Sequence, residues 1–69
     1  MTKEVLETGK TADGRLEISI WKITQDDGTY YYTVGNESWG LVWVFKTLSA
    51  TQRRFDWLCS RRAVVSFRR

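Results

Sequence analysis

The chain has 69 residues, a formal net charge of +3 and a hydrophobic fraction of 42%. A chain this short forms one domain, over residues 1–69, and buries only a small core. It has no histidine and a single cysteine, Cys59. These counts exclude an internal disulfide, a zinc site with histidine ligands and a zinc site with four cysteines. We therefore expect self-association to supply additional stability.

Residues 4–8 are the first candidate strand. Residues 15–24 follow, with Leu16, Ile18 and Ile20 at every second position. This alternation is typical of a strand that is buried on one face. The two segments are predicted to pair across the glycine-containing turn between them.

Two further strands follow in the same pattern. Residues 25–28, Gln-Asp-Asp-Gly, are typical of a hairpin loop, and residues 29–34 are rich in β-branched and aromatic side chains. A second turn at residues 35–38 precedes an apolar segment at residues 41–45. The first part of the chain is therefore predicted to be a four-stranded antiparallel meander.

The periodicity then changes to that of a helix. Ser49 and Gln52 fit a capping box at a helix N-terminus. The apolar residues downstream recur at helical spacing: Phe55, Leu58 and Cys59. We predict a helix over residues 50–62 that packs on one face of the sheet, which gives an α+β fold. Residues 63–67 are either the end of that helix or a short fifth strand.

One helix covers one face of a four-stranded sheet, so the second face needs another explanation. The sequence predicts an aromatic outer face made either of Trp21, Tyr31 and Trp43 or of the row Leu41, Trp43 and Phe45. Three interpretations stay open: half-exposed aromatics on a thin core, an interface with a second copy or another protein, and a platform on which nucleic-acid bases stack.

The helix is predicted to carry a basic stripe on the side opposite Phe55. Its members are Arg53, Arg54, Trp57 and Arg61. Arginine offers a planar fork for phosphates and carboxylates, and tryptophan offers a stacking plane. The stripe is therefore a candidate partner-binding surface, and the alternative is an ordinary solvated helix face.

The charge distribution supports an anionic partner for the C-terminal part of the chain. Residues 1–40 carry four basic and seven acidic side chains, a balance of −3, whereas residues 41–69 carry seven basic and one acidic, a balance of +6. The basic part binds either an external anionic partner or the acidic strands of a second subunit.

Catalysis is not expected. The chain lacks histidine, the most common general base, and contains no phosphate-binding loop. Cys59 is expected to face the core, and the acidic pair Asp26 and Asp27 belongs to a turn, where aspartate is used for local hydrogen bonding. We expect no metal, no cofactor and no enzymatic activity.

These observations favour a small cytoplasmic interaction protein without a membrane partner, because no segment approaches the ~18 apolar residues of a membrane span and the first residues do not resemble a signal peptide. The leading hypothesis is a homodimer that binds and blocks a larger protein or a protein–nucleic acid complex. Phage and mobile-element accessory proteins of the anti-defence type are of this size, and the location would then be the host cytoplasm. The alternative is a small single-stranded nucleic-acid-binding protein.

Overall fold

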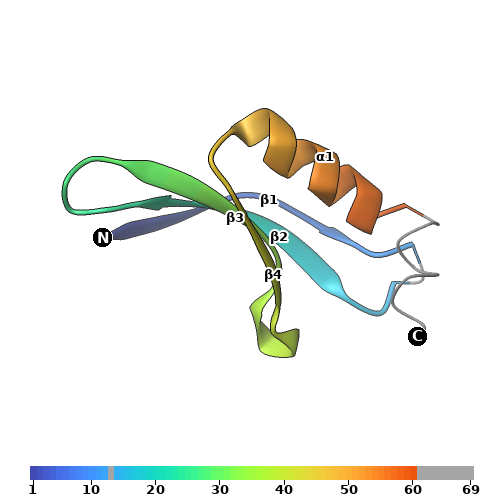
Figure 1. Ribbon diagram of the computed structural model, residues 1–69. Helices are drawn as coiled ribbons and strands as arrows, with labels where there is room; N and C mark the ends of the chain where they lie inside the picture. Colours follow the sequence, from blue (N-terminus) through green and yellow to red (C-terminus); the bar gives the residue numbers. More distant parts are fainter. Residues whose placement is uncertain (13, 61–69) are drawn as a thin grey trace.

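Four antiparallel strands form one sheet, and a single helix lies across one of its faces (Figure 1). The computed structural model describes residues 1–12 and 14–60. In chain order the elements are β1 (Thr2–Lys10), β2 (Glu17–Thr24), β3 (Tyr30–Asn36), a 3₁₀ turn η1 (Glu37–Trp39), β4 (Leu41–Phe45) and α1 (Leu48–Leu58). The sheet order β1-β2-β3-β4 confirms the predicted meander and the α+β fold. The suggested fifth strand at residues 63–67 lies outside the described residues.

The loop between β2 and β3 forms at the predicted residues. The amide of Gln25 donates to the carbonyl oxygen of Thr29 at 2.8 Å, which closes the hairpin. Gly28 has a φ of 90°, a conformation that glycine adopts without strain. The Asp27 carboxylate accepts hydrogen bonds from the amide and the hydroxyl of Thr29. These bonds lower the pKa of Asp27, because they stabilise the charged carboxylate.

A glycine is required where β3 leads into β4. Gly35 has a φ of 143°, and a Cβ atom at this position would lie 1.8 Å from the carbonyl oxygen of Leu41. No side chain fits at that distance. After Gly35, the Asn36 side chain caps η1 by accepting from the amide of Trp39, and Gly40 ends η1 with a φ of 69°. The predicted turn is therefore a short 3₁₀ turn that projects from the sheet on the side away from α1 (Figure 1).

The helix begins two residues earlier than predicted. Its N-cap is Thr47, whose hydroxyl oxygen accepts a hydrogen bond from the amide of Ala50, so the capping box expected at Ser49 is wrong. Thr47 has extended backbone angles and lies one residue after the end of β4, so it caps the amide of Ala50 without a longer connection. The helix ends at Leu58, with Cys59 as its C-cap, instead of continuing to residue 62.

The core lies between α1 and the middle of the sheet. Ile18, Val34 and Leu58 are 0% exposed, and Ile20 and Phe55 complete the contact. The alternating apolar residues of β2 thus meet the apolar stripe of α1, as the two periodicities predict. Burying a side chain of this size stabilises the fold by about 1.5–3 kcal/mol. This packing fixes which side of α1 faces solvent and therefore positions the candidate site.

Candidate interaction site

The register of the sheet decides which aromatic residues share a face. Ile20 pairs with Val34, and Val34 pairs with Trp43, so all three lie on the side covered by α1. Trp21, the next residue along β2, points to the opposite side. The predicted grouping of Trp21, Tyr31 and Trp43 on one face is therefore wrong, because Trp43 belongs to the other face.

The alternative row of β4 lies on the helix side as well. Leu41, Trp43 and Phe45 are all half-buried and pack against the core. This row is therefore not an uncovered face of the sheet. These three residues extend the core, whereas the other two apolar residues of the strand, Val42 and Val44, point the other way and are 40% and 63% exposed.

The sheet face away from α1, which we call the open face, retains two of the predicted aromatics, Trp21 and Tyr31. Its residues follow from the pairing of the strands: Val5, Trp21, Ile23, Tyr31, Thr33, Val42 and Val44. The Lys3 ammonium lies 4.9 Å from the centre of the Trp21 ring and donates to the Glu37 carboxylate at 3.0 Å. Since the Lys3 ammonium lies over this ring, Trp21 is not a bare stacking plane.

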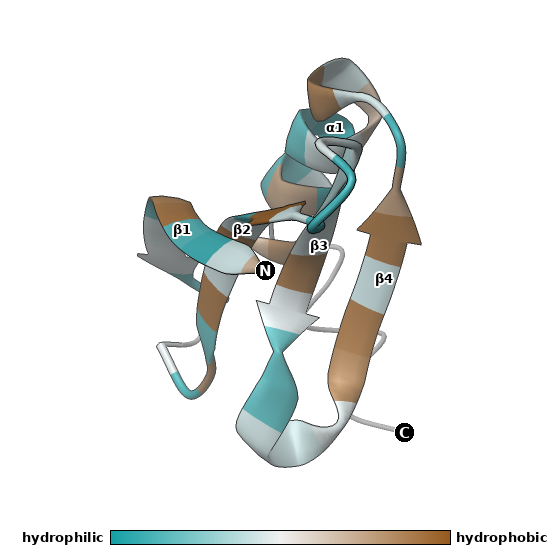
Figure 2. Cartoon of the chain, turned by 90° about the vertical axis from the view of Figure 1, so that its left-hand side faces the viewer, coloured by the Kyte–Doolittle hydropathy of each residue, from teal (hydrophilic) through white to brown (hydrophobic). Residues whose placement is uncertain are grey.

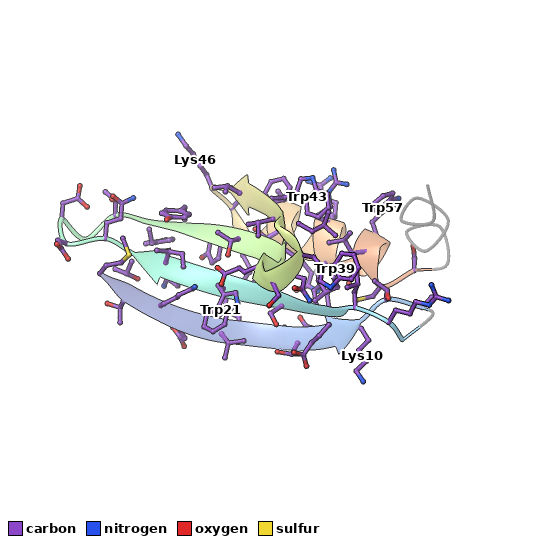
Figure 3. All side chains as sticks on the ribbon, turned by 90° about the horizontal axis from the view of Figure 1, so that it is seen from below. Lys10, Trp21, Trp39, Trp43, Lys46 and Trp57 are labelled. Atoms are coloured by element: carbon purple, nitrogen blue, oxygen red, sulfur yellow. The ribbon has the colours of Figure 1, made fainter. Side chains whose placement is uncertain are left out.

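A cluster of two arginines and two tryptophans lies at the junction of α1 and β4. We call Trp43, Arg53, Arg54 and Trp57 the Arg/Trp cluster. The Arg54 guanidinium carbon lies 5.1 Å from the ring centre of Trp43 and 5.0 Å from that of Trp57. Figure 3 shows Trp43, Trp57 and Lys46 on the β4 side of the sheet, with Lys10 on the β1 side.

The cluster combines unpaired positive charge with apolar surface. Arg53 is exposed, Arg54 and Trp57 are half-buried, and the three line a shallow pocket. In residues 1–12 and 14–60, neither arginine forms an ion pair with a carboxylate. The structure therefore brings three of the four predicted stripe residues together and adds Trp43 from β4. The fourth, Arg61, lies outside the described residues.

Trp39 is an exposed aromatic residue that the sequence interpretation missed. It lies in η1 and is 73% exposed. A tryptophan between the turn residues Asn36 and Gly40 lies outside the predicted strands and helix, and this position was the signal in the sequence. Large exposed aromatics are typical binding anchors.

Cys59 lies half-buried between α1 and β1. A Cβ atom on Gly9 would lie 3.4 Å from its sulfur. Burial raises the pKa of the Cys59 thiol, and the carboxylates of Asp56 and Glu7 raise it further. A raised pKa disfavours the nucleophilic thiolate. The position therefore suits a structural role.

Among the described residues, no group of three or more histidine, cysteine, aspartate or glutamate side chains could hold a metal ion. No helix in residues 1–12 and 14–60 is long and apolar enough to cross a membrane. Neither the family models, nor the curated proteins, nor the solved structures contain a match to this chain.

Proposed function

We propose that this protein is a non-enzymatic interaction protein that acts as a homodimer and blocks a larger protein or protein–nucleic acid complex by binding to it. The observation that carries the proposal is the Arg/Trp cluster, in which Arg54 lies against two tryptophan rings beside the exposed Arg53. Tryptophan and arginine are the residues most enriched among those that dominate binding energy at interfaces.

The packing of Arg54 favours binding in two ways. Contacts with Trp43 and Trp57 restrict its side chain before a partner arrives, so less conformational entropy is lost on binding. Because Arg53 and Arg54 form no ion pair within the described residues, a carboxylate or phosphate of the partner meets no competing carboxylate from that part of the chain. The complementary surface is therefore anionic, with an apolar groove or pocket that accepts Trp57.

The test compares charge reversals on the two sides of the molecule. Arg53→Glu reverses an exposed charge in the cluster, and Lys10→Glu is the matched control at the β1 edge (Figure 3). We expect a partner captured by the parent protein to be lost with Arg53→Glu and kept with Lys10→Glu. Arg53→Glu should melt like the parent, and Lys10→Glu slightly lower, because Lys10 lies opposite Glu17 in the sheet. Equal capture by all three proteins would contradict the proposal.

The second candidate function is direct binding of single-stranded nucleic acid by the same cluster. Two tryptophan rings beside two arginines supply stacking planes and phosphate ligands together. Titration with single-stranded and double-stranded oligonucleotides at low and high salt separates the two functions. Nucleic-acid binding weakens as salt rises, and Arg53→Gln reduces the salt slope by about 1. Absence of binding to oligonucleotides leaves a protein surface as the target.

A further inference from the structure

The two edges of the sheet differ in their protection against pairing with another strand. The β1 edge carries four charged side chains, Lys3, Glu4, Glu7 and Lys10. Its pairing with β2 also shifts between Val5 and Glu7, as at a β-bulge. Charges and bulges are the usual devices that prevent edge-to-edge association. The β1 edge is therefore protected.

The β4 edge has none of these features. Residues 41–45, Leu-Val-Trp-Val-Phe, contain no charge, and their pairing with β3 is regular. An edge strand directs part of its amides and carbonyls outward. Within the described part of the chain, no backbone hydrogen bond outside the sheet and helix satisfies them. Figure 2 shows β4 as a largely hydrophobic strand at the margin of the sheet.

We infer that a second copy of the chain pairs with β4 in antiparallel orientation, about a two-fold axis at Trp43. This register sets Trp43 opposite the partner's Trp43, Val42 opposite the partner's Val44, and Leu41 opposite the partner's Phe45. Every pair is apolar, and aromatic pairs across strands are favourable. The sequence of β4 is thus complementary to itself in the arrangement that a two-fold interface requires.

The interface also draws on neighbouring side chains. A standard interface buries roughly 800 Å² per partner, more than a five-residue edge provides. Trp43 is half-buried within β4, and the exposed Trp39 lies two residues before the start of this strand. A fully buried tryptophan buries about 150–250 Å², and part of that area is still exposed on each of these rings. Further burial of these two rings adds to the area that the strand edge contributes.

Pairing along β4 joins the two Arg/Trp clusters into one site. The two-fold axis is perpendicular to the sheet, so both copies of α1 lie on the same face of the eight-stranded sheet. The helix packs mainly on β2 and β3. With strands ~4.8 Å apart and helices ~10 Å wide, a gap of roughly 9 Å separates the two helices. Trp43 from each copy forms its floor, and Arg54 and Trp57 from each copy line its walls.

This inference rests on the proposed homodimer and specifies its interface. A groove of this width, with Arg54 on both walls, accepts one extended anionic chain or loop of the partner. The site is incomplete in a single copy, because one wall is missing. Binding of the partner should therefore be lost when the dimer is disrupted.

The test uses two double variants with the same number of new charges. Val42→Lys with Val44→Lys places lysine opposite lysine at both flanking pairs, and like charges directly opposite destabilise a sheet. Val42→Lys with Val44→Glu places lysine opposite glutamate at the same pairs. Both positions are exposed on the open face, so each monomer is expected to retain its circular dichroism spectrum.

In sedimentation equilibrium at micromolar concentration, we expect the parent and the Lys/Glu variant to have twice the chain mass of 8.1 kDa, and the Lys/Lys variant to be a monomer. A monomeric parent, or two double variants with equal association, would overturn the inference. If the Lys/Lys variant unfolds, hydrogen exchange of the parent protein provides a second test. The β4 amides should become more protected from exchange as the protein concentration rises, and protection that does not depend on concentration would also overturn the inference. A dimer that captures no partner would refute the proposed function and leave the interface intact.

Discussion

The Arg54 guanidinium lies about equally far from the rings of Trp43 and Trp57, at 5.1 and 5.0 Å. Replacing Arg54 with glutamine removes both cation–π contacts and keeps a polar side chain of similar length. A partly exposed contact of this kind contributes about 0.5–1 kcal/mol. We therefore expect Arg54→Gln to lower the free energy of unfolding by about 1–2 kcal/mol. The sequence alone does not predict this cost, since it places Arg54 on the helix side opposite Phe55 without indicating a contact with Trp43.

Thermal melts monitored by circular dichroism measure this difference. For a domain of this size, 1 kcal/mol shifts Tm by ~4–8 °C. The matched control is Arg53→Gln, because Arg53 is the exposed neighbour and its replacement should stay within about 0.5 kcal/mol. A double-mutant cycle with Trp57→Leu should give a coupling free energy of about 0.5–1 kcal/mol between Arg54 and Trp57. Equal Tm values for the two glutamine variants, or zero coupling, would refute this account of the cluster.

Three further predictions follow from particular residues. Gly35→Ala should leave the chain largely unfolded, because its Cβ would lie 1.8 Å from the Leu41 carbonyl oxygen; a cooperative melt near the parent Tm would show that the β3–β4 connection is misplaced. Cys59 should be alkylated more slowly at pH 8 in the folded protein than in denaturant, since its pKa is raised. The folded protein binds the thiol proton more tightly than the unfolded chain does. The thiol's contribution to the free energy of unfolding is therefore complete below the unfolded pKa and is lost as pH rises through the folded pKa. A free energy of unfolding that increases over that pH range, relative to Cys59→Ala, would contradict the raised pKa. Trp39→Ser should change stability by no more than about 0.5 kcal/mol, because the side chain is 73% exposed, and a larger loss in a denaturant titration would place Trp39 in a contact.

The order and type of the elements could be predicted from the sequence, because they depend on local patterns. Alternation in β2, the glycine-containing hairpin loop and the helical spacing of Phe55 and Leu58 each act within a few residues. The start of α1 was harder to predict, since Thr47 and Ser49 both have the chemistry of an N-cap. The position of β4 decided between them, because Thr47 follows that strand in the extended conformation that an N-cap requires.

The composition of the candidate site depended on contacts between distant parts of the chain. The sequence identified Arg53, Arg54 and Trp57 as neighbours on one helix. Only the register across β2, β3 and β4 places Trp43 on the helix side, next to Arg54. Alternation along a strand assigns its side chains to the two faces of the sheet, but it does not indicate which face the helix covers. Tertiary packing makes that choice, because it depends on how neighbouring strands align and on where α1 crosses the sheet.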